Sequence, residues 1–115
     1  MASPATYNQV VPQATTYQFQ FQIQDSVTGP WNLTDYLVTM TVRPFAGSTT
    51  VTILATNLNG KISVDGPEGR VTVTLSALDT AIKAEPYVYD LMLDSGSVVT
   101  RALEGQFIVT AGVTV

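Results

Sequence analysis

The sequence predicts an all-β protein in which about seven short strands form two packed antiparallel sheets. Three observations lead to this prediction. Apolar and polar residues alternate over many short segments, and turn-forming residues separate these segments. No long segment has helical periodicity, so the apolar face of each strand must be buried against another sheet. The 115 residues suffice for one domain with a single core, which we place at residues 17–115.

The N-terminal residues 1–16 lack a sustained period and contain Pro4 and Pro12. Between the prolines lies the apolar pair Val10 and Val11. Terminal segments of this kind are poorly ordered unless other groups hold them in place. We therefore expect an extended arm that is flexible or becomes ordered on a partner protein, with Val10 and Val11 as partner contacts.

Strict alternation begins at residue 17 and predicts the first strand of the domain. One face would carry Tyr17, Phe19, Phe21 and Ile23, and the other would carry Gln18, Gln20, Gln22 and Gln24. Since successive side chains of a strand point to opposite faces, we expect a buried aromatic face and an amide face. Residues 25–30 contain Gly29-Pro30 and predict a turn, after which Trp31 and Leu33 return to the core.

The next segments predict three more strands. Residues 36–43 alternate and end at a proline, which lacks a backbone donor for a sheet. Residues 50–56 and 61–64 lie on either side of Asn59-Gly60, a strong signal for a hairpin turn. We expect these two segments to pair with each other in antiparallel fashion.

The second half of the chain continues the pattern. Residues 71–75 alternate as a fifth strand, and residues 76–83 could form one helical turn with Ser76 as its cap. Residues 87–94 and 98–103 predict a second hairpin. Glycine inside a strand commonly marks a bulge, so we expect Glu104-Gly105 to interrupt or bulge the last strand before residues 106–110.

The composition argues against several classes of function. Without cysteine or histidine there is no disulfide, thiolate zinc site or thiol nucleophile, and the usual acid–base group at neutral pH is missing. The net charge of -4 opposes binding to nucleic acid or anionic lipid. No leader pattern and no long apolar run is present, which predicts a protein without a cleaved signal or a membrane span. We expect a binding or assembly protein with no cofactor, and not an enzyme.

The nine carboxylates are scattered, and most lie beside turn-forming residues, so we predict no catalytic residue and no metal site. A calcium site made by Asp90 and Asp94 with Asp25 or Asp35 is conceivable, but the sequence has no Asp-x-Asp-x-Asp-Gly loop. Asp90 is unusual because it lies in mid-strand. If buried, it should pair with Arg43 or Arg101, or with backbone donors.

Two groups of residues could bind a partner. Trp31, Tyr36, Tyr87 and Tyr89 could stack on a sugar, although core packing is favoured for all but Trp31, which lies beside a turn. The glutamine ladder is either an ordinary solvated face or a face that a neighbouring subunit covers. The predicted partner-binding residues are Gln18, Gln20, Gln22, Gln24, Trp31, Val10 and Val11.

Several segments resemble a family of small phage virion proteins, namely tail and baseplate components related to the N-terminal domain of baseplate upper proteins. The similarity covers roughly residues 17–110 and includes the strand at 17–25, Gly69-Arg-Val-Thr-Val73, Tyr89-Asp-Leu-Met-Leu-Asp94 and Gly105-Gln-Phe-Ile-Val109. This resemblance implies an immunoglobulin-like β-sandwich with a structural or adaptor role. The sequence ends at Val115 without the long region of those proteins, so we expect a ring, collar, decoration or connector subunit.

The resulting hypothesis is a phage structural or adaptor protein of the tail, baseplate or head–tail connector region. It would be made in the bacterial cytoplasm, reside in the virion, and form a homo-oligomeric ring or array with other virion proteins. The alternatives are a capsid decoration protein on the head surface and a carbohydrate-binding module that attaches to a host glycan.

Overall fold

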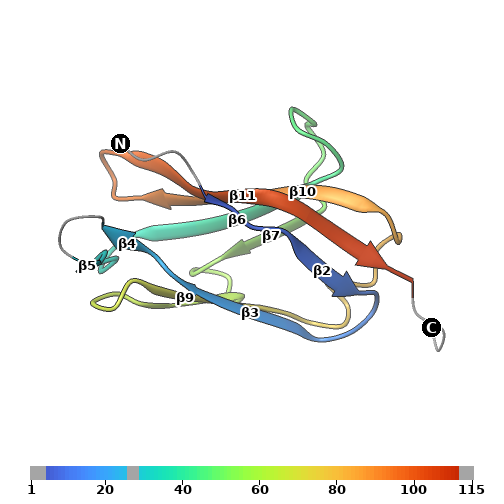
Figure 1. Ribbon diagram of the computed structural model, residues 1–115, viewed down its shortest axis with the longest axis horizontal. Coiled ribbons are helices and arrows are strands. Elements are labelled where there is room, and N and C mark those ends of the chain that lie inside the picture. Colours follow the sequence, from blue (N-terminus) through green and yellow to red (C-terminus); the bar gives the residue numbers. More distant parts are fainter. Residues whose placement is uncertain (1–4, 26–28, 112–115) are drawn as a thin grey trace.

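The structure is a computed structural model that describes residues 5–25 and 29–111, and all its regular elements in these residues are β-strands (Figure 1). The strands are β1 (Ala5–Thr6), β2 (Gln9–Pro12), β3 (Tyr17–Gln22), β4 (Gln24–Asp25), β5 (Gly29–Pro30), β6 (Leu37–Arg43), β7 (Ile53–Thr56), β8 (Ile62–Asp65), β9 (Arg70–Leu75), β10 (Pro86–Asp94) and β11 (Val99–Thr110). Of the predicted turn at residues 25–30, the central residues 26–28 lie outside the described part.

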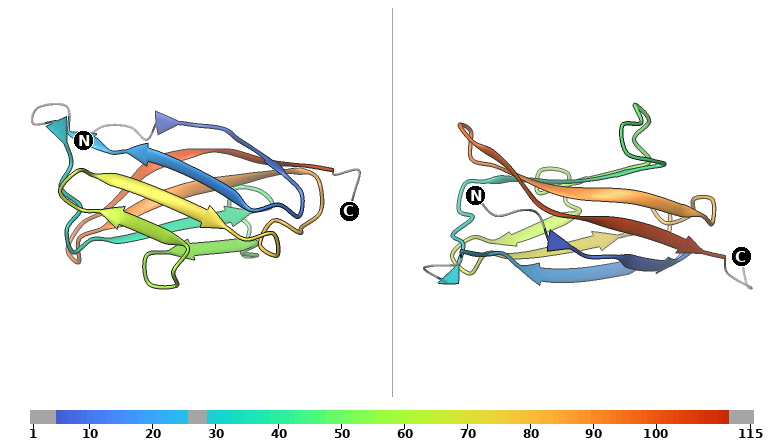
Figure 2. Two further views of the ribbon diagram at one scale, coloured as in Figure 1. Left: turned by 90° about the horizontal axis from the view of Figure 1, so that it is seen from below. Right: turned by 45° about the horizontal axis from the view of Figure 1, so that its top comes forward.

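Two sheets pack face to face, as the side views in Figure 2 show. The six-stranded sheet has the order β1-β11-β10-β6-β7, with β2 also paired to β11. The three-stranded sheet has the order β3-β9-β8, and β4 and β5 form a small separate ribbon. The prediction of an all-β sandwich is therefore confirmed.

The core lies between the two sheets and follows the alternation of the sequence. In β6 the buried residues are Val38, Met40 and Val42, while the residues between them are half-buried. The same alternation buries one face of β9 and one face of β10. A strand with one apolar face contributes that face to the core, and the opposite face remains at the surface.

Residues 5–12, expected to be an arm that is flexible or becomes ordered on a partner protein, contain two strands that pair with β11 of their own chain. β2 pairs in parallel with residues 107–110 of β11, and β1 pairs in parallel with residues 103 and 104 of the same strand. Val11 is fully buried and Gln9 is 5% exposed, whereas Val10 is 57% exposed. Alternation did not predict this strand, because the polar residue Gln9 points inward and the apolar residue Val10 points outward. Residues 1–4 lie outside the described part of the chain.

The predicted hairpin at Asn59-Gly60 is also wrong. β7 pairs with β6 in the six-stranded sheet, while β8 pairs with β9 in the three-stranded sheet. The turn thus carries the chain from one sheet to the other. Gly60 adopts a φ of 83° there, and the Asn59 side chain accepts hydrogen bonds from the backbone nitrogens of Thr56 and Lys61. The same turn residues can serve a hairpin or a corner between sheets.

The hairpin of β10 and β11 is confirmed, but its bulge is elsewhere. The register places Leu91 opposite Leu103 and Met92 opposite Arg101, so Ala102 is the extra residue. Gly105 lies within a continuous strand. A β-carbon at this position would lie 2.4 Å from the carbonyl oxygen of Tyr7. The glycine is therefore needed because the N-terminal segment approaches β11 closely.

One turn follows β9, as expected from Ser76. The Ser76 hydroxyl accepts a hydrogen bond from Asp79 N, and Asp79 Oδ2 accepts one from Ser76 N. Asp79 also forms an ion pair of 2.7 Å with Lys61. Partial burial opposes ionisation, but the hydrogen bonds from Lys61 and Ser76 lower the pKa of Asp79 below its ordinary value. This turn connects the three-stranded sheet to β10.

Candidate interaction surfaces

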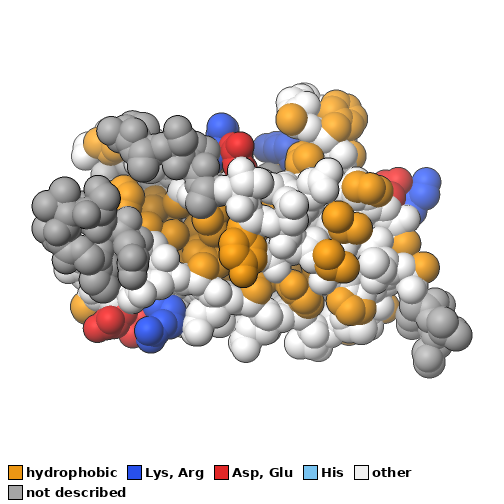
Figure 3. Space-filling model, viewed as in Figure 1, with side chains coloured by type: hydrophobic (Ala, Val, Ile, Leu, Met, Phe, Trp, Pro, Cys, Tyr) orange, Lys and Arg blue, Asp and Glu red, His pale blue; other side chains and the backbone are white. Residues whose placement is uncertain are grey.

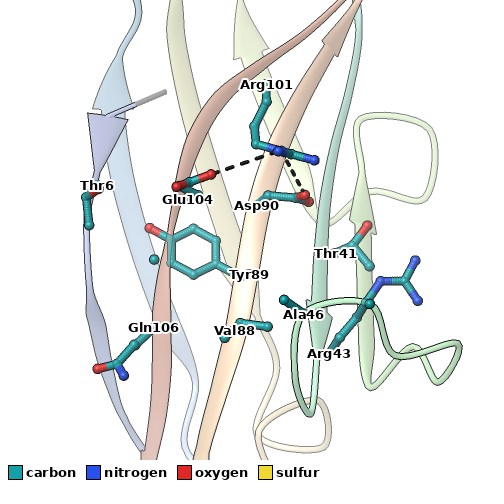
Figure 4. Close-up of a pocket in the computed structure, with 12 residues that line it drawn as sticks. Thr6, Thr41, Arg43, Ala46, Val88, Tyr89, Asp90, Arg101, Glu104 and Gln106 are labelled. Carbon is teal, nitrogen blue, oxygen red and sulfur yellow. Dashed lines mark ion pairs between the residues drawn. The ribbon is translucent and has the colours of Figure 1, made fainter. Parts of the chain in front are cut away.

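A groove of about 570 Å³ crosses the outer face of the six-stranded sheet. It runs over β1, β11, β10 and β6, and the loop after β6 closes one side (Figure 4). The charged residues that line it are Arg43, Asp90, Arg101 and Glu104. They reach the groove because they occupy the outward positions of strands whose alternate residues form the core.

Three of the four charged side chains in this groove form one ion-pair network. Asp90 lies opposite Glu104 in the register of β10 and β11. Arg101 Nε lies 3.3 Å from Asp90 Oδ2, and Arg101 Nη1 lies 4.0 Å from Glu104 Oε1 (Figure 4). The sequence left Arg43, Arg101 and backbone donors as partners of Asp90 if it were buried; its side chain is 31% exposed, and of the two arginines it pairs with Arg101. Arg43 instead donates to the Ser48 carbonyl oxygen at 2.9 Å, which holds the loop against the strand.

The groove therefore has two cationic and two anionic side chains, and Arg101 binds both carboxylates. This arrangement is an ion-pair network on a sheet surface. It stabilises the cross-strand pairing modestly, because the side chains of Arg101 and Glu104 are about half exposed. The balanced charge gives the groove no strong preference for an ionic ligand.

Among the described residues, no group of three or more acidic, histidine or cysteine side chains could hold a metal ion. Two of the residues considered for calcium have other partners: Asp90 pairs with Arg101, and Asp94 Oδ1 accepts a hydrogen bond from Gly96 N at 2.8 Å. Asp94 thus forms the turn of the β10–β11 hairpin, as its position in the sequence indicates.

The glutamine ladder forms the outer face of β3. Gln18 and Gln20 each donate to a threonine hydroxyl of β9, at Thr74 and Thr72 respectively, over 2.9 Å. Gln22 donates to the Glu68 carbonyl oxygen. These three side chains are exposed, and the side chain of Gln24 lies outside the described residues. The face is thus polar, uncharged at its centre and ordered by cross-strand hydrogen bonds.

The other face of β3 carries an aromatic row. Tyr17 and Phe19 have ring centroids 5.8 Å apart, and those of Phe19 and Phe21 are 6.0 Å apart. All three side chains pack against the core but remain partly exposed. Figure 3 shows hydrophobic side chains along the seam between β2 and β3. The Tyr17 hydroxyl donates to Gln9 Oε1 across this seam, and burial, with a smaller effect of Tyr7, raises the pKa of Tyr17.

β3 is an edge strand: within residues 5–25 and 29–111, β9 is its one sheet partner. Thr74 N donates to Lys61 O, so the backbone of Thr74 faces β8 and not β3. In an antiparallel ladder, the residue opposite such a position turns its own backbone groups away from the pair. The amide and carbonyl of Gln18, opposite Thr74, therefore point to the outer edge, and those of Gln20 follow by alternation.

The structure divides the remaining predicted partner residues. Val10 is exposed, but Val11 is fully buried within its own chain, so it does not lie at the surface as a partner contact was expected to. Trp31 is partly buried and packs edge-on against Tyr36 at 6.2 Å, so it does not stand alone as a flat platform.

The preference for core packing is confirmed for Tyr87 and Tyr89, each 4% exposed. Their hydroxyls donate to the carbonyl oxygens of Lys83 and Tyr7, respectively. Burial raises the pKa of both phenols, with a further contribution from Glu85 for Tyr87. Both tyrosines therefore belong to the framework of the sandwich.

The sequence analysis did not anticipate four exposed apolar side chains on β7 and its flanking loops. They are Phe45, Val51, Leu54 and Leu58, with exposed fractions of 62, 45, 48 and 82%. Their exposure could not be predicted from the sequence, because it depends on the position of β7 at the edge of its sheet. That edge is partly covered, because Asn59 Nδ2 donates to Leu54 O and Asn59 Oδ1 accepts from Thr56 N, each at 3.0 Å.

Comparison with known protein families finds no family that matches this sequence, and no curated protein is detectably similar to it. None of the described residues forms a helix that is long and apolar enough to cross a membrane.

Proposed function

We propose that this chain is a phage virion structural or adaptor protein that assembles by protein–protein contacts in the tail, baseplate or head–tail connector region. The open outer edge of β3 is the observation that carries the proposal. Edge strands of soluble proteins are usually shielded by charged residues, bulges or covering loops. The β3 edge has six consecutive residues without a charge, and its partner strand β9 is on the opposite side.

The chemistry of this edge suits an extended strand of another subunit. The outward backbone groups of Gln18 and Gln20 would supply main-chain hydrogen bonds. The aromatic row on the inner side would supply apolar contact area, and the neutral glutamine face would add no repulsion between copies. We infer a homo-oligomeric ring or array, in contact with other virion proteins.

The proposal includes an immunoglobulin-like fold. In immunoglobulin domains one sheet has the strand order A-B-E-D and the other contains G-F-C, extended by C′ in variable domains. The order β3-β9-β8 facing β11-β10-β6-β7 corresponds to B-E-D facing G-F-C-C′. The position of strand A beside B is the one that the β3 edge leaves open, which supports the assignment of that edge as an assembly surface.

The proposal assigns no enzymatic activity and no cofactor. This part of the proposal is supported by the partners of the polar side chains. In the groove, Arg101 pairs with Asp90, and on β3 the glutamines donate hydrogen bonds to threonines of β9. Such a surface is suited to recognition of a folded partner.

Mass spectrometry and a density map of purified particles test the proposed location. The protein should be present in tail, baseplate or connector density, and its absence from mature virions would refute the proposal. A position on the head surface would instead assign it as a capsid decoration protein. Binding to a host glycan array that is lost in Trp31→Ala would assign the carbohydrate-binding alternative.

A pair of variants tests the β3 edge directly. Gln18→Lys/Gln20→Lys places two charges on the edge, and incorporation into particles should fall at least tenfold. Ser63→Lys/Asp65→Asn raises the net charge by the same two units at exposed positions of β8, so it serves as a charge-matched control that should be incorporated normally. Equal incorporation of both variants would show that the β3 edge is not the assembly surface.

A further inference from the structure

We infer that the N-terminal strands exchange between copies, so that β1 and β2 of one chain pair with β11 of a second chain. This inference rests on the proposed assembly by protein–protein contacts and names a segment that makes them. Exchange of a terminal element creates a dimer with the same contacts that the monomer makes within itself.

The contacts of the segment are specific and can be remade between chains. The parallel pairing runs from Gln9 opposite Phe107 to Pro12 opposite Thr110. Val11 fills a fully buried position, and Gln9 accepts a hydrogen bond from the Tyr17 hydroxyl. Because β2 of this chain already fits the site with a buried valine and a buried amide, the occupant that needs no new contacts is the same segment of a second copy.

Residues 13–16 form the hinge, which crosses from the six-stranded to the three-stranded sheet (Figure 2). Ala14 has a φ of 58°, in the left-handed region that non-glycine residues seldom adopt. A short, strained connection favours exchange, because opening it releases the strain. In the open form Ala14 can become extended, and the hinge can continue β3 toward the N-terminus.

The hydrogen bonds of the hinge divide at Ala14. Gln13 bonds to Thr110 O and Ile82 O, partners that the second copy offers in the same place. Thr15 bonds through its backbone to the Thr80 hydroxyl and would stay with its own domain. Two hydrogen bonds span the pivot, from Ala14 N to Thr80 O and from Thr15 Oγ1 to Pro12 O. Opening the hinge therefore breaks these two hydrogen bonds, and exchange restores the other contacts of the hinge.

The absence of cysteine from the chain makes the exchange directly measurable. Val10 and Ile108 are register partners of β2 and β11. The single variants Val10→Cys and Ile108→Cys are unfolded together at high concentration, refolded, oxidised and run on a non-reducing gel. Exchange predicts a disulfide-linked heterodimer well above the background set by mixing Val10→Cys with Ser63→Cys. A yield no higher than this background would overturn the inference.

Two hinge substitutions should shift the dimer fraction in opposite directions. Ala14→Gly removes the strain and should lower the exchanged fraction roughly tenfold. Ala14→Pro is incompatible with a positive φ and should raise it. Light scattering reports the dimer, and thermal melting verifies that both variants fold. The same dimer fraction in all three proteins would contradict the inference, whereas the location of the protein in particles tests the proposed function separately.

Discussion

The edges of β11 and β3 flank one seam of the sandwich, and they differ in whether another strand covers them (Figure 1). The outer edge of β11 is covered by β1 and β2, and the outer edge of β3 has no strand partner among the described residues. Both edges have few charges. The covered edge contributes to stability through buried side chains such as Val11, and the open edge retains backbone groups that can bind another chain. A low number of charged residues along a strand therefore does not by itself identify an edge that is free to bind a partner.

The largest effect should come from the covered edge. Val11→Asp places a carboxylate without a partner in a fully buried position and should cost about 3 kcal/mol or more of unfolding free energy. Val10→Asp, one residue earlier and 57% exposed, is the matched control and should change stability by less than about 0.5 kcal/mol. Urea denaturation measures both. Similar small losses in the two variants would mean that β2 does not pack on β11.

A smaller effect should follow from Gly105→Ala. The added β-carbon would lie 2.4 Å from Tyr7 O, so the N-terminal segment must move away from β11 at a cost of about 1–3 kcal/mol. Hydrogen exchange should show faster exchange of the Tyr7 amide, which donates to Glu104 O, with no change at the β3–β9 pairing. Unchanged protection of Tyr7 would disprove the close approach.

The turn that leads away from the open-edge sheet should respond to acid. The folded state lowers the pKa of Asp79, so this stabilisation is complete above its ordinary value of 3.8 and disappears as the pH falls through the lowered value. Asp79→Asn should cost about 1 kcal/mol near neutral pH, and this cost should shrink as the pH falls below 3.8. Denaturation midpoints of both proteins across this range test it, and a constant difference would exclude a role of the charge.

The smallest effect is expected on the open-edge sheet itself. Thr72→Val/Thr74→Val removes the hydroxyls that accept from Gln20 and Gln18 but retains β-branched residues. These hydrogen bonds are exposed, so stability should change by less than about 0.5 kcal/mol. Thermal melts measure the change. A loss above about 1 kcal/mol would show that the glutamine ladder serves the fold more than a partner.

Local patterns predicted most strands because each depends on nearby residues. The alternation of residues 36–43 gives the buried face of β6, and the turn after Asp94 joins β10 to β11 as expected. The errors occurred where the outcome depends on distant residues. Gly105 was read as a bulge, but its neighbour is Tyr7, far away in the sequence. Asn59-Gly60 has the chemistry of a hairpin turn, and local sequence does not specify which sheet each flanking strand joins.

The candidate interaction residues show the same division. The exposure of Gln18, Gln20 and Gln22 followed from alternation, and the structure agrees. The burial of Val11 did not follow from its neighbours, because Gln9 is stabilised inside by the Tyr17 hydroxyl, a contact between two different sheets. The exposure of Leu54 on β7 likewise could not be predicted locally, because it depends on the position of that strand at the edge of its sheet.

The sequence by itself determined the all-β character, the faces of the long strands and the lack of cysteine and histidine chemistry, since these follow from composition and periodicity. The tertiary structure decided which edge the N-terminal strands cover and which edge has no strand partner among residues 5–25 and 29–111. The physical reason is that edge pairing depends on contacts between residues distant in sequence, such as Tyr7 with Gly105 and Val11 with the core. These contacts form only when both sheets are in place.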